Sequence, residues 1–477
     1  MKNLPLLHWM EDIDPVLIER ADNYRATRLK PYLRVAMIAA AVLLLLTVAL
    51  TSLTVWRLDT YVRQEYAEEY DGTLLHALDI VLTQDENTVS TLLGEQNKRD
   101  LHVLFNALRG VSDDEKQTDS EQTEQEVYSE GLEYRSRGDG NCSVVGIGSC
   151  KDIHLIIPKY SPDGELVVDI GEGAFENCVT ITKVTIPDSV TQIQEAAFRY
   201  CTKLTEITLP ENLTYIGDFA FESCWKLTEL HIPASVTHIG QGIVGKTLLL
   251  ESITVAPENT TYHSIENCLI ETSSGTLIAG CSTSVIPDGV TSIGAYAFYC
   301  CSGLRNLSVP EGVTSIGEYA FLGCNTLTEI TFPQTLTSVG MFAFAECSIL
   351  RSVVFPESMT QIAGMAFQKC EKLESVILPA DVDSIGLNVF RECVSLTEID
   401  IPDGWTTIPG RMFQSCWKLE RVGIPDSVTK IGVSAFEQCG ELRNVHIPDG
   451  VTSISDNTFY NCSLTEIHIP EGVTSIG

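Results

Sequence analysis

The sequence has little positive charge and no recognisable metal or catalytic motif. Lys and Arg number 31 against 64 Asp and Glu, so the net charge is −33 at pH 7. Nucleic acid is excluded as a partner. Binding to its phosphates gains free energy when basic side chains displace counterions, whereas this acidic chain would be repelled. The nine His are scattered, and no His-Glu-x-x-His or Cys-x2-Cys motif occurs. The sequence therefore predicts no cofactor, no metal site and no enzyme.

Long apolar runs are also missing, with one exception. Residues 35–56 (VAMIAAAVLLLLTVALTSLTVW) carry no charge, and at about 1.5 Å per residue they reach about 33 Å, enough to cross a membrane. A cleaved signal peptide would have a shorter apolar region nearer the start. Trp56 stands at the far edge, where interfacial anchors lie. This pattern predicts one transmembrane helix.

The charges on either side of this segment predict its orientation. Five basic residues lie shortly before it and two follow closely: Arg20, Arg25, Arg28, Lys30 and Arg34, then Arg57 and Arg63. The positive-inside rule places residues 1–34 in the cytoplasm and the long C-terminal part outside the cell. Most of the acidity is then extracellular.

The segments around the apolar run have distinct compositions. Residues 14–28 form an amphipathic pattern within the predicted cytoplasmic tail, and residues 57–110 show helical apolar spacing typical of a stalk. Residues 111–130 are rich in Asp, Glu, Gln, Ser and Thr. They predict an acidic, disordered linker.

From about residue 131 the chain repeats every 23 residues. Phe marks one phase at 175, 198 and 221, and again at 298, 321, 344, 367, 390, 413, 436 and 459. A Cys follows each of these Phe by three residues, and a Pro recurs in a third phase. The unit is close to LTEITIP-DGVTSIG-EYAF-xxC. A fixed period of this length is typical of a solenoid.

Each part of the unit has a physical role. LTEITIP alternates apolar and polar residues and predicts a short strand, which Pro ends. VTSIG predicts a second extended stretch, and AFxxC a helical or turn segment whose Phe and Cys point inward. One unit cannot bury its apolar face alone, so stacked units must share a core.

This unit resembles the repeat of the BspA-like leucine-rich-repeat family of microbial surface proteins, across about residues 131–477. The resemblance implies a right-handed leucine-rich-repeat solenoid of 23-residue coils, with a parallel sheet on its concave side. It also implies adhesion to host proteins or other cells. With the predicted anchor and helical stalk, the expected fold class is a membrane-anchored, β-rich solenoid.

The period breaks between Pro257 and Pro287. Residues 268–281 (CLIETSSGTLIAGC) predict two strands joined by a turn at Ser274 and Gly275. We expect a hairpin insertion, at about residues 258–286, that projects from the solenoid.

Eleven of the sixteen Cys share one repeat phase. An extracellular location favours disulfides, yet this regularity predicts a buried ladder of free thiols that pack as small apolar residues. If disulfides form, we expect them at Cys142–Cys150 or Cys268–Cys281.

Two short motifs are interpreted as coincidental. Residues 240–247 (GQGIVGKT) match the phosphate-binding loop pattern, but the repeat places a strand after them instead of the required helix. Arg137, Gly138 and Asp139 form an integrin-type tripeptide, in a context where Gly and Asp also suit a turn.

Three sets of exposed residues are candidates for contact with a partner. Val354 and Ile377 are apolar where the outward positions of neighbouring strands are mostly polar, as in a binding hot spot. Tyr296, Tyr319, Phe342 and Met365 share one phase in consecutive coils, either as a contact ridge or, as we favour, as a packing ladder. His446 and His468 occupy outward positions in adjacent coils.

The favoured function is cell-surface binding or adhesion without catalysis, in which the solenoid recognises an extracellular protein or glycan. The alternative is a transmembrane sensor, whose solenoid binds a ligand and whose cytoplasmic tail signals. The residues do not identify the ligand.

Overall fold

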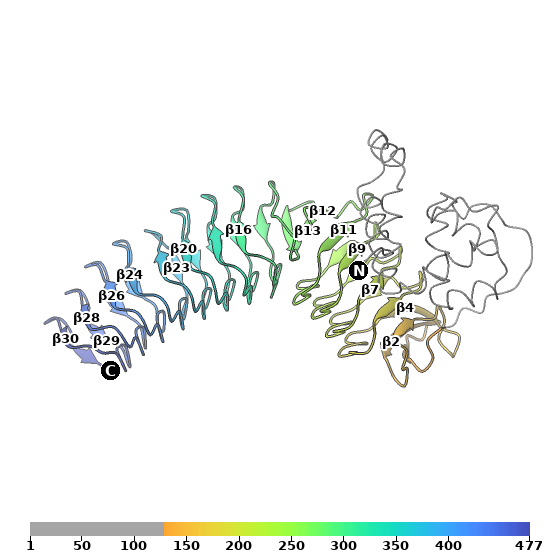
Figure 1. Cartoon of the computed structure of the whole chain (residues 1–477), viewed down its shortest axis with the longest axis horizontal. Helices are drawn as coiled ribbons and strands as arrows, with labels where there is room; N and C mark the ends of the chain where they lie inside the picture. The colour runs from red at the N-terminus through yellow and green to blue at the C-terminus, as the bar shows by residue number, and fades with distance from the viewer. Residues whose placement is uncertain (1–127) are drawn as a thin grey trace, which may run out of the picture. The chain divides into compact units, whose positions relative to one another are not determined.

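Residues 128–477 form a solenoid of stacked coils (Figure 1). The computed structural model describes these residues. The predicted cytoplasmic tail with its amphipathic helix, the transmembrane segment 35–56, the stalk 57–110 and most of the linker lie outside the described residues. Within residues 128–477, no helix is long and apolar enough to span a membrane.

The first side of each coil is the strand predicted from the LTEITIP stretch. These strands pair in parallel with the strands of neighbouring coils, as Val184 does with Ile207. In most of them the central residue is buried and the flanking residues are more exposed, because side chains alternate along a strand. The strands are β3 (His154–Ile156), β5 (Lys183–Thr185), β7 (Glu206–Thr208), β9 (Glu229–Ile232), β11 (Ser252–Val255), β16 (Asn306–Ser308), β18 (Glu329–Thr331), β20 (Ser352–Val354), β22 (Ser375–Ile377), β24 (Glu398–Asp400), β26 (Arg421–Gly423), β28 (Asn444–His446) and β30 (Glu466–His468).

The second side is the VTSIG stretch, which also forms parallel strands. A Gly ends most of them because the coils approach closely there; a Cβ atom at Gly217 would lie 2.5 Å from the backbone nitrogen of Glu195. The strands are β2 (Asn141–Gly146), β4 (Leu166–Ile170), β6 (Gln192–Ile193), β8 (Tyr215–Ile216), β10 (His238–Ile239), β15 (Ser292–Ile293), β17 (Ser315–Ile316), β19 (Ser338–Val339), β21 (Gln361–Ile362), β23 (Ser384–Ile385), β25 (Thr407–Ile408), β27 (Lys430–Ile431), β29 (Ser453–Ile454) and β31 (Ser475–Ile476).

The third side, AFxxC, is a turn rather than a helix. The turns of neighbouring coils are joined by backbone hydrogen bonds, such as Phe198 N–H to the Ala220 oxygen at 2.9 Å. The residues two before and two after each Phe adopt positive φ, as Arg411 (56°) and Ser415 (61°) do. Gly173, Gly242 and Gly323 occupy the same phases in other coils.

The core is built on the repeated Phe. Rings of neighbouring coils stack with centroids 5.0 to 5.9 Å apart. At the N-terminal end, β1 (Glu133–Ser136) pairs antiparallel with β2, so its backbone closes that edge of the second-side sheet.

The insertion does not project from the solenoid, contrary to the sequence prediction. Its strands β12 (Tyr262–Ile265), β13 (Cys268–Glu271) and β14 (Thr276–Ala279) continue the second-side sheet, in which β14 pairs with β15. The predicted hairpin of β13 and β14 is confirmed. Its two faces are both buried: Leu269 packs in the core cluster before the insertion, and Ile270 in the cluster after it.

The inserted strands leave the third side uninterrupted. There the Lys246 N–H donates to the Tyr299 oxygen at 2.9 Å, so the turns of these two coils meet directly although 53 residues separate them in sequence. The insertion adds strands to the second side and none to the third side. The junction between these two coils is therefore wedge-shaped.

Candidate functional site

Val354 and Ile377 lie side by side on the outer face of the first-side strands. Strands β20 and β22 pair in parallel, with Val354 opposite Ile377. The side chains are 54% and 60% exposed, whereas Val353 and Val376 point into the core. The predicted outward position and adjacency are therefore confirmed. Their part in binding stays a prediction.

Polar side chains surround this apolar pair. Ser352, Ser375 and Thr331 are its uncharged neighbours on the same face. Farther out, Arg351 pairs with Glu374 at 3.2 Å. An apolar centre within a polar rim is the usual anatomy of a protein interface.

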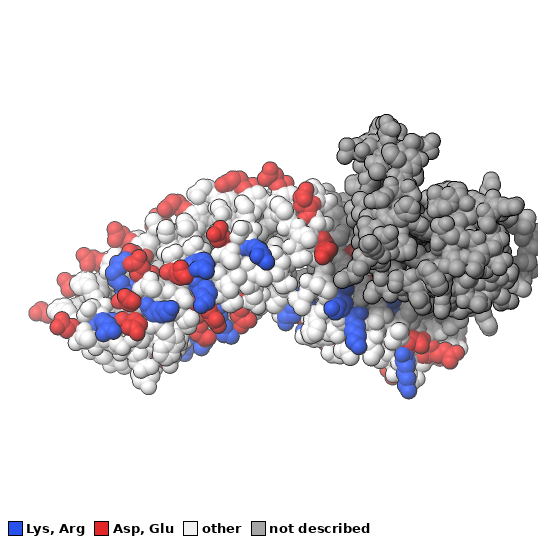
Figure 2. All heavy atoms as spheres, in the orientation of Figure 1, with Lys and Arg blue, Asp and Glu red and all other residues white. Residues whose placement is uncertain are grey.

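The rim is mainly acidic where the chain turns after the strand-ending prolines. Glu357, Asp381 and Asp403 are exposed there, and none of them forms an ion pair within residues 128–477. On the face shown in Figure 2, acidic side chains recur along the upper outline of the solenoid. A partner at this face would meet negative charge around the apolar pair.

One charged cluster beside the pair is internally compensated. The Arg421 guanidinium binds both Asp400 oxygens, at 2.7 and 3.0 Å, and its Nε lies 3.3 Å from Glu398. This hydrogen bonding lowers the pKa of Asp400. A Cβ atom at Gly423 would clash with the Asp400 carboxylate, so Gly at this position leaves room for the pair. All three charged groups are exposed, and such pairs stabilise a fold by little.

The aromatic residues that share one phase form a packed row. The Tyr296 and Tyr319 rings stack at 4.7 Å, and those of Tyr319 and Phe342 at 5.1 Å. Phe342 and Tyr319 also line a shallow depression with Lys369. Stacking covers the ring faces, which a sugar ring would need for contact, and leaves mainly ring edges exposed. This geometry supports the packing alternative, and the positive φ of these residues recurs at the same phase in other coils.

His446 and His468 face each other across β28 and β30, in register and exposed. Within residues 128–477, no group of three or more His, Cys, Asp or Glu is arranged to hold a metal ion. The two imidazoles stay predicted candidates for contact with a partner.

The integrin-type tripeptide does not present a free Arg. Arg137 forms an ion pair with the buried Asp169 and a 3.3 Å hydrogen bond to Ser143. Asp139 is exposed, and its carboxylate accepts the Asn141 N–H at 3.1 Å. The tripeptide is thus part of the N-terminal turn structure.

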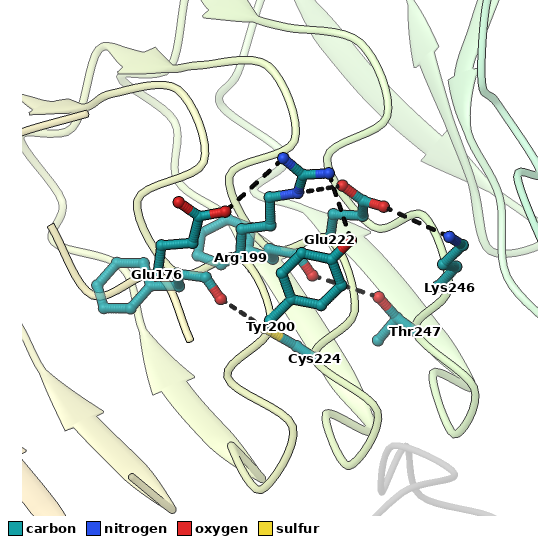
Figure 3. A network of polar contacts seen from close by, with 9 residues as sticks. Glu176, Arg199, Tyr200, Glu222, Cys224, Lys246 and Thr247 are labelled. Atoms are coloured by element: carbon teal, nitrogen blue, oxygen red, sulfur yellow. Dashed lines mark hydrogen bonds and ion pairs between the residues drawn. The ribbon is translucent and has the colours of Figure 1, made fainter. Parts of the chain in front are cut away.

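The residues that match a phosphate-binding loop form an ordinary repeat turn, as expected. Lys246 lies 4.0 Å from the buried Glu222 carboxylate, which Arg199 contacts at 2.7 Å. Figure 3 shows Arg199 and Lys246 reaching Glu222 from opposite sides. The Lys246 ammonium also lies 4.8 Å from the centre of the Tyr299 ring. This network joins coils and engages the Lys246 ammonium with Glu222 and Tyr299.

The cysteines of the repeat phase form a ladder of thiol hydrogen bonds. Cys224 Sγ donates to the Phe198 oxygen at 3.3 Å, one coil back, and Thr247 takes the Cys position and makes the equivalent bond (Figure 3). All sixteen cysteines lie within the described residues and are free, so neither candidate disulfide is formed. Burial raises the pKa of the Cys416 thiol to about 12.

Sequence reasoning missed one exposed apolar surface. Trp225, Leu248, Leu249 and Val179 are each between 42% and 48% exposed. They follow the Cys position of their coils by one or two residues. The repeat frame could have identified them, because most coils carry polar or small residues in the phase that follows Cys.

Comparison with known proteins agrees with this architecture. A leucine-rich repeat protein from Bacteroides ovatus shares 25% sequence identity, with a TM-score of 0.50 over 74% of this chain and 90% of that one. One from Eubacterium ventriosum shares 24% identity, with a TM-score of 0.53 over 72% and 96% respectively, and shows the fold alone. Among curated proteins, none matches the chain.

The family model described as the BspA type leucine rich repeat region matches in six copies, at residues 168–275, 278–380 and 360–477. These matches cover more than half of the chain, and they coincide with the stacked coils of the structure. The chain therefore belongs to the BspA-type leucine-rich-repeat family.

Proposed function

We propose that the protein is a cell-surface binding protein that recognises an extracellular protein through the outer face of its first-side strands. The observation that carries this proposal is the in-register pair of Val354 and Ile377, exposed at the centre of a polar rim. A few central residues that lose their contact with water on binding supply most of the binding energy in protein interfaces. Membership of a repeat-based family supports a binding role without catalysis.

The strand face favours a protein partner, and the aromatic row on the turn side does not favour a glycan. The aromatic faces that would stack on sugar rings are covered by neighbouring rings in the row from Tyr296 to Phe342.

The apolar segment 35–56 supports anchorage in a membrane, with the N-terminus in the cytoplasm and the solenoid outside.

The test compares the full chain with the Val354→Asp/Ile377→Asp variant for binding to a panel of purified extracellular-matrix and serum proteins, by surface plasmon resonance. We expect affinity for any bound protein to fall at least about tenfold, because a buried unpaired carboxylate costs more than about 1.4 kcal/mol. Val285→Asp is the matched control, because Val285 is 62% exposed in the corresponding outward position. Unchanged affinity in the double variant, with circular dichroism showing intact folding, would rule out this face.

A further inference from the structure

The apolar surface that the sequence did not reveal has a defined place in the fold. We name it the basic corner: Val179, Trp225, Leu248 and Leu249, with Lys203 and Lys226. Each residue follows the Cys position of its coil by one or two residues, in four consecutive coils. Neighbouring coils are joined by backbone hydrogen bonds in the adjacent turn, such as Tyr200 N–H to the Glu222 oxygen at 2.8 Å. The six side chains therefore form one strip.

This strip combines exposed apolar side chains of neighbouring coils with unpaired positive charge. Trp225 is 45% exposed, and Val179, Leu248 and Leu249 are exposed to a similar extent. The equivalent Trp417 is 47% exposed as well, but Gly440 occupies its phase in the next coil. Lys203 and Lys226 are exposed, and neither forms an ion pair within residues 128–477. Two adjacent uncompensated ammonium groups are unusual in a chain with a net charge of −33.

A partner for the basic corner must offer apolar side chains flanked by unpaired carboxylates, since opposite charges select and orient interfaces. The strand face around Val354 and Ile377 has this chemistry. Exposed Glu357, Asp381 and Asp403 follow the ends of the strands that carry the pair and of the next strand.

We propose that the basic corner of one molecule binds the strand face around Val354 and Ile377 of a second copy. This inference rests on the proposed function, because it names the partner of the same strand face. The two surfaces belong to different coils of one continuous stack and cannot meet within a molecule. The contact is therefore heterologous, and repetition of it joins chains head to tail.

The experiment measures energy transfer between donor- and acceptor-labelled full chains in detergent. Wild-type chains should associate, and more weakly as salt is raised. Lys203→Glu/Lys226→Glu and Glu357→Lys/Asp403→Lys should each lower self-association by at least about tenfold. A mixture of the two variants should associate again, because each then offers the charge that the other lacks.

The matched control is Lys151→Glu/Lys430→Glu, which makes the same charge change at exposed lysines that have no ion pair within the described residues. Its self-association should equal that of the wild type. Monomeric wild-type chains, equal weakening by the control, or failure of the mixture to associate would each overturn the proposal. The proposal would also be overturned if the Trp225→Ser variant lost adsorption to anionic vesicles while its energy transfer stayed unchanged. The basic corner would then contact lipid.

These outcomes remain distinct from those of the proposed function. If wild-type chains stay monomeric while Val354→Asp/Ile377→Asp loses an extracellular protein, the strand face binds a different partner. Only the self-association then fails.

Discussion

The thiol of Cys370 donates a hydrogen bond to the carbonyl oxygen of Phe344, 3.2 Å away in the preceding coil. The same oxygen accepts the backbone N–H of Cys347 at 3.3 Å. Each Phe carbonyl in this ladder thus receives one bond from its own coil and one from the next. The Cys phase joins coils as well as filling space.

Replacement of Cys370 should show both contributions. Cys370→Ala removes the donor and leaves a small cavity, so we expect it to lower the free energy of unfolding by about 1–2 kcal/mol. Cys370→Ser should cost less, because its hydroxyl can still donate to Phe344, as Thr247 does to Phe221. Denaturant unfolding measures both variants. Equal losses would show that the hydrogen bond contributes nothing.

Stability should fall in alkali because burial raises the pKa of the ladder thiols, to about 12 for Cys416. A raised folded pKa gives stability that is complete below the unfolded thiol pKa of about 8.5. It is lost as the pH rises toward the folded value. We therefore expect the free energy of unfolding to decline between about pH 8.5 and 12. The decline should be shallower in Cys416→Ala than in the wild type. An identical slope in the two proteins would show that other groups cause the decline.

Glycine should stabilise the turn positions with positive φ. Arg411 has a φ of 56°, is exposed and has no ion-pair partner within residues 128–477. Arg411→Gly should raise the free energy of unfolding by about 1 kcal/mol, because L-residues are strained in this region. Lys418→Gly, at an exposed position without positive φ, should be neutral or destabilising. A gain in both variants would contradict the backbone explanation.

The two cations at Glu222 should contribute unequally. Arg199→Met removes the contact at 2.7 Å from a carboxylate that is 3% exposed, and we expect a loss of about 2–3 kcal/mol. Lys246→Met removes the 4.0 Å contact and should cost less than about 1 kcal/mol. Lys369→Met, in the exposed pair with Glu346, is the control. Thermal unfolding compares them, and a larger loss from Lys246→Met would reverse the ranking.

Periodicity was enough to predict most of the fold. Phe175, Phe198 and Phe221 are equally spaced, and equal spacing in a stack of equivalent units requires equivalent environments, so their burial follows from the repeat. The alternation within each strand likewise placed Val354 and Ile377 outward. The basic corner around Trp225 was not predicted, because the phase after Cys lies in a turn, where no alternation indicates which side chains face outward.

The insertion shows where local patterns stop being informative. Its sequence indicated two strands and a turn, and these are present in β13 and β14. Whether the hairpin projected or packed depended on what covered its two faces. Leu269 and Ile270 are both buried only because a complete core lies on each side.

The sequence by itself determined the repeat, the two ladders of strands and the buried Phe and Cys phases, because each repeat must bury the same apolar face against its neighbour. Only the tertiary structure decided which carbonyl each thiol bonds, how the inserted strands join the sheet and which charges stay unpaired. Those features depend on distances between residues of different coils, such as Lys246 and Tyr299, which no local pattern encodes.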